Sequence, residues 1–195
     1  MVRKLSQRAT QRLLSKKIIE EGDTEIYQYG LEQLLTSIID LLTLLFIGQI
    51  TGMLLQGIVF VLSFMLLRKY AGGYHATSPL KCFLLTNLVI LGALSVMKYF
   101  RMSIFVYLGF FFASSIIVFI FSPVESKNKG LDEIEKNIYR RKTLLTWFIE
   151  LLLLILMLIA NCLGFAKCII MGVAMVGVSQ LLGYIEIKLS NEETD

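Results

Sequence analysis

Six long apolar blocks, separated by short polar segments, restrict this chain to folds in which helices cross a bilayer. They lie at about residues 31–49, 50–67, 82–100, 103–121, 143–160 and 165–187. About 20 consecutive apolar residues are needed to span the hydrocarbon core of a membrane. Because no water in that core can satisfy backbone N–H and C=O groups, each span must be helical. The sequence therefore predicts an all-α, polytopic transmembrane helix bundle of about six spans, forming a single membrane domain over residues 1–195.

Composition agrees with this prediction and excludes a soluble globular domain. The chain is 56% hydrophobic, whereas soluble domains are about 45–50% apolar. The first two blocks run together, and we expect a tight turn between two spans at the sequence GQITG, residues 48–52. The cysteine count of 3 is odd, which argues against a disulfide framework. Cys162 and Cys168 would either pair with each other or pack as small apolar side chains.

Lysine and arginine are concentrated on one side of the predicted spans. Of the 19 Lys and Arg residues, only Lys98, Arg101 and Lys167 fall in segments on the opposite side. Cytosolic segments of membrane proteins are enriched in Lys and Arg. We therefore expect a multi-pass protein of the cell membrane with both termini in the cytosol. The segment 68–82, the polar loop 122–142 and the tail 188–195 should face the same side.

The N-terminal segment 1–28 is predicted to form a basic helix. Arg8, Arg12 and Lys16 recur every four residues, which places them on one helical face. Such a helix would lie against the anionic cytosolic surface of the membrane. The alternative is that these charges only orient the protein. The charged start of the chain, through Lys17, predicts no cleavable signal peptide.

The segment between the second and third spans, RKYAGGYHATSPLKC, carries the residues best suited to catalysis. His75 is the only histidine of the chain, and Cys82 follows it beyond a Ser-Pro pair. Serine is favoured at a helix N-cap and proline at the first helical position. Cys82 would then lie in the first helical turn, where the helix dipole favours a thiolate. His75 could act as the base that activates this thiol.

Pro79 decides whether His75 and Cys82 can meet. On one unbroken helix their spacing would separate them by about 10 Å. Because proline cannot occupy a helix interior, the chain must turn between them, and this turn can bring the imidazole over the helix start. Backbone N–H groups in such a turn or at a helix start can form an oxyanion hole. The candidates for this role, or for orienting the reacting groups, are Gly72, Gly73 and Ser78.

Spacing alone leaves a non-catalytic interpretation open. A lone cysteine in a membrane protein usually serves packing, and a histidine in a polar loop needs no function. We predict no metal ion and no cofactor, because one histidine and one nearby cysteine fall short of the four ligands of a structural zinc site.

The run RKYAGGYHA, residues 68–76, followed by Cys82, resembles the signature of the AgrB family (accessory gene regulator B). These proteins are the membrane endopeptidases of Gram-positive peptide quorum sensing. The family pattern is a basic residue, an A-x-G-x-H-A run and then a cysteine in fixed register, which here is AGGYHA and Cys82. The basic N-terminal segment, the length of 195 residues and the lysine-rich loop after Pro123 are also similar to the family.

The resemblance implies a cysteine endopeptidase in the cell membrane of a Gram-positive bacterium. AgrB-like enzymes cut a small precursor peptide, AgrD, in front of its acidic C-terminal tail. The enzyme cysteine attacks the scissile carbonyl, and the remaining peptide is held as a thioester. An internal cysteine or serine of the peptide then closes a thiolactone or lactone ring. By position, Cys82 would be the nucleophile and His75 the base.

Two groups of charged residues have candidate roles in this scheme. An acidic leaving tail would suit a basic surface, although membrane orientation alone would demand the same charges. The candidate residues for tail binding are Arg68, Lys69, Lys127, Lys129, Arg140, Arg141 and Lys142. Carboxyl groups within spans are costly and usually face protein or water. Glu32 or Asp40 would therefore either orient His75 as a third catalytic group or make interhelical hydrogen bonds.

The expected partners are an AgrD-like precursor peptide and the lipid bilayer, with no nucleic acid. A homodimer is compatible with so small a bundle, but no motif in the sequence requires one. One alternative function is a non-enzymatic membrane subunit for peptide export or sensing, which would tolerate Cys82→Ser. Another is an acyl-transfer enzyme, which would carry a lipid thioester on Cys82.

Overall fold

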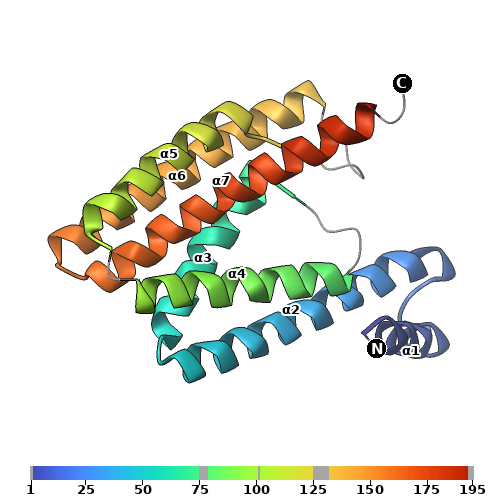
Figure 1. The fold of residues 1–195 in the computed structure, drawn as a ribbon. Helices are drawn as coiled ribbons and strands as arrows, with labels where there is room; N and C mark the ends of the chain where they lie inside the picture. Colours follow the sequence, from blue (N-terminus) through green and yellow to red (C-terminus); the bar gives the residue numbers. More distant parts are fainter. Residues whose placement is uncertain (1, 75–78, 101, 125–131, 193–195) are drawn as a thin grey trace.

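The computed structural model of the chain describes residues 2–74, 79–100, 102–124 and 132–192. This part of the chain is helical throughout, apart from turns, short connections and one isolated bridge between Gly72 and Val124. Its elements (Figure 1) are α1 (Val2–Ser15), the short 3-10 helix η1 (Glu21–Asp23), α2 (Thr24–Thr51), α3 (Leu54–Ala71), α4 (Pro79–Tyr99), α5 (Ile104–Phe121), α6 (Glu133–Ile159) and α7 (Leu163–Glu192).

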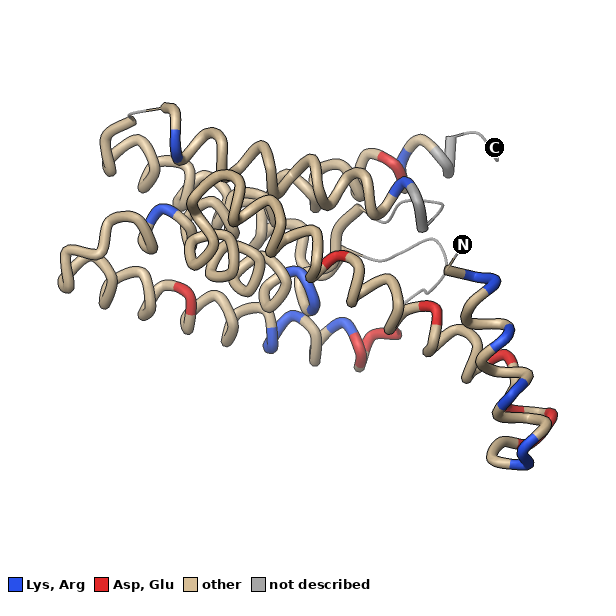
Figure 2. Tube along the Cα trace, turned by 90° about the horizontal axis from the view of Figure 1, so that it is seen from below, with Lys and Arg blue, Asp and Glu red and all other residues tan. Residues whose placement is uncertain are grey.

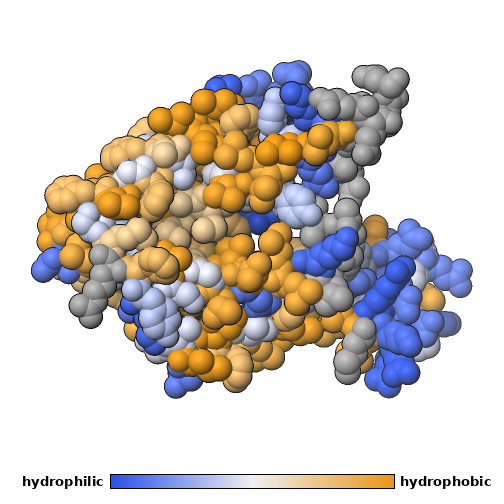
Figure 3. All heavy atoms as spheres, in the orientation of Figure 1, coloured by the Kyte–Doolittle hydropathy of each residue, from blue (hydrophilic) through white to orange (hydrophobic). Residues whose placement is uncertain are grey.

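Within the described residues, 6 helices, α2 to α7, are long and apolar enough to cross a membrane. This confirms the predicted all-α class with six spans. Large apolar side chains such as Leu42, Phe46 and Phe105 are exposed on these helices, and apolar residues cover most of the face in Figure 3. A bilayer solvates such a surface, whereas water would not.

The spans form two groups that α3 connects. Figure 1 shows α2 and α4 side by side on one side and α5, α6 and α7 on the other, with α3 crossing between them. The two groups diverge toward the end where α3 stops and α4 starts. In the most apolar part of α7, 67% of the residues are buried, compared with 11% in α2. Helix α7, which packs mainly against α5 and α3, is thus the central helix of the bundle.

The core lies where α3, α5, α6 and α7 meet. Its largest fully buried side chains include Phe60, Tyr107 and Phe111. The ring of Trp147 stacks on Phe111 at a centroid distance of 5.9 Å, and its indole N–H donates to Ser115 Oγ over 2.8 Å. Buried aromatic side chains contribute a large contact area, and the indole N–H needs such a partner when it is buried.

The predicted turn at residues 48–52 is present. Gly52 ends α2 with a φ of 67°, and its N–H bonds back to the carbonyl oxygens of Gln49 and Gly48. This left-handed conformation is one that glycine adopts without steric cost. A Cβ atom at Gly48 would lie 2.9 Å from the Cα of Leu54, so the start of α3 returns closely along the end of α2.

Two helix boundaries differ from the sequence predictions. The N-terminal helix was expected over 1–28 but ends at Ser15, and Lys17 has a φ of 54°, which interrupts the helix. The polar loop was expected over 122–142, but α6 already begins at Glu133. Asp132 caps this helix by accepting the N–H of Glu135 over 2.6 Å, and acidic residues in a first turn suit the helix dipole. The segment 133–142 is therefore a polar extension of a span.

Helix α1 packs against α2 at one end of the molecule. Its buried residues are the small polar Ser6 and Thr10, and Thr10 Oγ1 returns a hydrogen bond to the carbonyl of Ser6 over 2.9 Å. Figure 2 shows Lys and Arg along α1, outside the main bundle. The predicted basic helix is present, and its contact with a membrane surface stays a prediction.

Candidate active site

Cys82 lies in the first turn of α4, which begins at Pro79 as the sequence predicted. All 3 cysteines are free thiols, of which Cys82 and Cys162 are exposed and Cys168 is buried. The anticipated alternative of a Cys162–Cys168 pair is therefore not formed. A thiol in the first turn of a helix experiences the positive end of the helix dipole, which favours its nucleophilic thiolate form.

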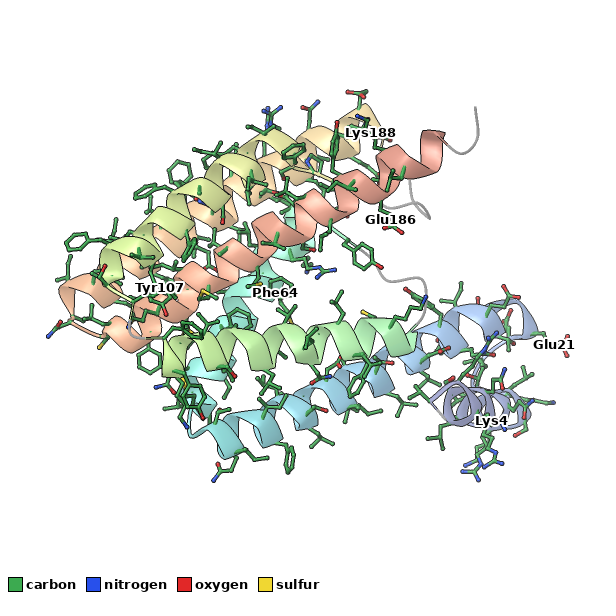
Figure 4. The ribbon with its side chains drawn as sticks, viewed as in Figure 1. Lys4, Glu21, Phe64, Tyr107, Glu186 and Lys188 are labelled. Atoms are coloured by element: carbon green, nitrogen blue, oxygen red, sulfur yellow. The ribbon has the colours of Figure 1, made fainter. Side chains whose placement is uncertain are left out.

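Cys82 lines a small pocket of about 60 Å³ between α3, α4 and α7. Figure 4 shows Phe64 on α3 in the region between α4 and α7. The walls are mainly apolar, with Phe64, Leu85, Thr86, Val89, Met175, Val178 and Leu182, and the remaining lining residues are Arg68, Tyr74 and Ser179.

Arg68, in the last turn of α3, places a cation in this pocket. Its guanidinium donates through Nη2 to the carbonyl oxygen of Tyr74 and lies 5.3 Å from the ring centroid of Phe64. Arg68 and Cys82 line the same pocket. A cation near a reactive thiol is typical of nucleophilic cysteines.

The backbone after α3 makes the sharp approach that the glycine pair suggested. Gly72 and Gly73 have φ values of 75° and 142°, which residues other than glycine rarely adopt. A Cβ atom on Gly72 would also clash with the carbonyl oxygen of Val124. The role of these two glycines in an oxyanion hole stays a prediction.

Four of the predicted site residues, His75, Ser78, Lys127 and Lys129, lie outside the described residues. Tyr74, however, is described, and it lines the same pocket as Cys82. His75 is the next residue in the sequence. The contact between the imidazole and Cys82 stays a prediction.

The two carboxylates proposed as orienting groups lie elsewhere on α2. Glu32 lines a polar groove of about 500 Å³ between α1 and α2, together with Arg3 and Gln7. Asp40 is partly buried within its span, and its Oδ1 has no hydrogen-bond partner among the described residues. Neither side chain lines the Cys82 pocket. A third catalytic group at either position stays a prediction without support from the described contacts.

Two described members of the predicted basic set, Lys69 and Lys142, lie close to Tyr70. The Nζ atoms of Lys69 and Lys142 lie 5.5 Å and 5.6 Å from the ring centroid of Tyr70, within the range of cation–π attraction. Arg140 and Arg141 are exposed on the same polar extension of α6. We refer to Lys69, Arg140, Arg141 and Lys142 as the basic surface. It lies beside the last turn of α3, which also carries Arg68.

Sequence reasoning missed the part of the site that α7 contributes. Ser179 lines the Cys82 pocket, and its carbonyl oxygen accepts the backbone N–H of Tyr74 over 2.8 Å. The available signal was Gly183, one helical turn further along α7, because an isolated glycine inside a helix often marks close approach of another backbone.

Taken together, these elements define a polytopic membrane protein with an exposed thiol at a helix start, in a pocket beside an arginine and a glycine-rich turn. The chain belongs to the accessory gene regulator B (AgrB) family, whose family model matches residues 6–181. AgrB proteins are known as a family of membrane peptidases, and the sequence resemblance is thereby confirmed at the level of the family.

Relatives of similar length support the same assignment. An AgrB-like protein of Clostridium perfringens (strain SM101 / Type A) is 31% identical over 168 residues, which cover 80% of this chain and 78% of that protein. An AgrB-like protein of Listeria monocytogenes (serovar 1/2a, strain EGD-e) is 33% identical over 142 residues, covering 70% and 69%. No solved structure matches the chain.

Proposed function

We propose that this protein is a membrane cysteine endopeptidase that removes the C-terminal tail of an AgrD-like precursor peptide and promotes cyclisation of the product. The observation that carries the proposal is the shared pocket of Cys82, Arg68 and Tyr74. It places an exposed thiol next to a cation and next to the residue that precedes His75. Membership of the AgrB family supplies the substrate class.

In the first half of the proposed reaction, His75 accepts the proton of the Cys82 thiol, and the thiolate attacks the scissile carbonyl carbon. Backbone N–H groups at the start of α4 or in the glycine turn would stabilise the oxyanion. The C–N bond then breaks, and the imidazolium returns its proton to the leaving amine of the tail. The rest of the peptide is now a thioester on Sγ of Cys82.

In the second half, a thiol or hydroxyl group of the bound peptide attacks the thioester carbonyl and loses its proton. The new thiolactone or lactone bond forms as the Cys82–acyl bond breaks, and Cys82 recovers its proton. Thiol exchange on a thioester is nearly balanced in energy, so the energy of the acyl bond is retained for ring closure. The apolar walls of the pocket, such as Phe64, Val89 and Met175, would keep out the water that would otherwise hydrolyse the thioester.

The acidic tail of the precursor would be held by the basic surface. Lys69 and Lys142 approach Tyr70 from α3 and α6, so two helices contribute positive charge at one place. Such a surface attracts an anionic segment and holds it near the scissile bond. Lys127 and Lys129 would add to it from the loop before α6.

The proposed orientation places this end of the bundle, and both termini, in the cytosol. Its support is the unequal distribution of the 19 Lys and Arg residues over the segments between spans. A precursor made in the cytosol would then meet Cys82 directly. A homodimer stays a prediction.

The experiment that tests the function uses purified protein in liposomes with a candidate precursor that has an amphipathic start and an acidic end. Wild type, Cys82→Ala and His75→Ala are compared by intact mass. We expect wild type to release the tail and to gain a hydroxylamine-sensitive peptide adduct that Cys82→Ala does not form. Cleavage by Cys82→Ala would exclude the assigned nucleophile, and a lipid adduct on Cys82 would instead favour the acyl-transfer enzyme.

A further inference from the structure

The backbone between α3 and His75 is held by α7, a helix far away in the sequence. The N–H of Tyr74 donates to the carbonyl oxygen of Ser179 over 2.8 Å. The carbonyl oxygen of Ala71 accepts the Nε2–H of Gln180 over 2.9 Å. The N–H of Val124, from the segment that follows α5, also donates to this Ala71 carbonyl over 3.0 Å. Residues 71–74 are therefore attached both to α7 and to the connection after α5.

Gly183 is the residue that allows this approach. A Cβ atom at Gly183 would lie 2.8 Å from the N atom of Tyr74 and 2.9 Å from the carbonyl carbon of Gly73. In an α-helix the carbonyl of Ser179 already accepts the N–H of residue 183, so Tyr74 must reach the second lone pair of that oxygen from the side. Any side chain at position 183 would occupy the place through which it does so.

Gln180 supplies the second attachment, which is the one hydrogen bond of its side chain within the described residues. Its side chain is fully buried, with 0% exposed, and its Oε1 atom makes no hydrogen bond among the described residues. A buried amide with a half-satisfied side chain is costly. The bond that it does make is a second one, beside that of the Val124 N–H, to a carbonyl at the end of α3, where helical partners run out. Its place in an apolar span is explained by this contact.

The same segment borders the pocket that contains the thiol. Tyr74 lines the Cys82 pocket, and its carbonyl accepts from Arg68. Gly73 packs against α7 so closely that a Cβ atom there would lie 2.5 Å from Ser179 Oγ. The segment 72–74 thus contacts α7, which also lines the pocket through Val178, Ser179 and Leu182, and a displacement of α7 at this point would move Tyr74.

We infer that α7 is the platform that holds residues 71–74 beside the Cys82 pocket, with Gly183 and Gln180 as its positioning residues. This inference rests on the proposed function. Neither residue touches substrate; each acts through the backbone of residues 71–74. Misplacement of a catalytic group by about 1 Å can cost about a hundredfold in rate, so small changes at these two positions should have large effects on turnover.

The test compares Gly183→Ala and Gln180→Leu with two matched glycines of α7 in the liposome assay. Gly177→Ala is the control for a crowded glycine, because its Cβ would meet Ser114 of α5 at 3.1 Å. Gly164→Ala is the control for helix propensity, because nothing lies within 4 Å of its Cβ position. We expect Gly183→Ala and Gln180→Leu to lower kcat for tail release by about ten- to a hundredfold, with little change in KM. Both controls should retain the wild-type kcat.

A second readout follows Cys82 without any substrate. The alkylation rate of Cys82 is measured against pH by peptide mass, which separates it from the exposed Cys162. We expect His75→Ala to change this pH profile, and Gly183→Ala and Gln180→Leu to change it in the same way. If Gly183→Ala does not fold, Gln180→Leu still decides the question, since it replaces a buried amide by an apolar side chain of similar size.

The two proposals fail differently. If Cys82→Ala and His75→Ala both process the precursor as wild type does, the proposed function is wrong. If these two variants are inactive while Gly183→Ala and Gln180→Leu keep the wild-type kcat and pH profile, the platform is wrong and the proposed function stands. A loss of kcat in Gly177→Ala equal to that in Gly183→Ala would also overturn the platform, because the effect would then be general packing of α7.

Discussion

The hydroxyl oxygen of Ser63 on α3 lies 3.0 Å from Oε2 of Glu150 on α6, in the interior of the bundle. The same oxygen lies 3.3 Å from the carbonyl oxygen of Ile169 on α7. Glu150 is only 2% exposed, so its carboxyl group faces protein and not lipid, as expected for an acidic residue within a span. One serine thereby joins the three helices that surround the core.

The Ser63–Glu150 hydrogen bond predicts that substitutions at these two residues have coupled effects on the free energy of unfolding. Ser63→Ala would leave a buried carboxyl group without its donor and should lower the free energy of unfolding by about 1–3 kcal/mol. The double variant Ser63→Ala/Glu150→Leu removes both polar groups and should recover most of this loss. The free energies of unfolding of Ser63→Ala, Glu150→Leu and the double variant are measured in detergent by circular dichroism. If the loss in the double variant equals the sum of the losses in the two single variants, the hydrogen bond contributes nothing to stability.

Cys82→Ser keeps the size of the side chain but replaces the thiol by a much weaker nucleophile. We expect tail release to fall by about a thousandfold or more, with precursor binding retained, because the hydroxyl lacks the thiolate character that the helix start favours. Single-turnover cleavage and a separate binding measurement in liposomes check this. Wild-type turnover by the serine variant would exclude a thiolate nucleophile at Cys82.

Arg68→Met should slow the alkylation of Cys82 at neutral pH by several-fold. The guanidinium and the thiol line the same pocket, and without Arg68 a thiolate formed there would lose a neighbouring cation. The control is Lys167→Met, since the Nζ of Lys167 lies 5.1 Å from the ring centroid of Tyr107, away from the pocket. An unchanged alkylation rate in Arg68→Met would mean that Arg68 only holds the Tyr74 carbonyl.

Lys69→Ala and Lys142→Ala should each raise KM for a precursor with an acidic tail by about two- to fivefold, since exposed ion pairs contribute roughly 0.2–1 kcal/mol. The effect should shrink at high salt, because exposed charges are screened. A precursor whose tail carries Asn and Gln in place of Asp and Glu is the matched control. It should have the same KM with wild type, Lys69→Ala and Lys142→Ala. Equal losses with both precursors would show that the lysines act on folding and not on the tail.

Local sequence was sufficient for the parts of the fold that depend on near neighbours. Six apolar blocks predicted six spans because a span must be apolar over its whole length. Gly52 and Pro79 marked a helix end and a helix start because each has an intrinsic backbone preference. The start of α6 was missed because Asp132 caps it inside a polar segment, and a search for apolar residues does not detect a polar helical extension.

The family, the class of fold and the position of Cys82 at a helix start follow from the amino-acid sequence alone, because motif, hydropathy and local backbone preference specify them. The tertiary structure, in contrast, sets which side chains share the thiol's pocket. It brought Arg68 to Cys82, kept Glu32 and Asp40 away from that pocket and placed α7 behind residues 71–74. Gln180 and Ala71 are separated by 109 positions in the chain. Such a contact depends on how whole helices pack, and no local preference of either residue specifies it.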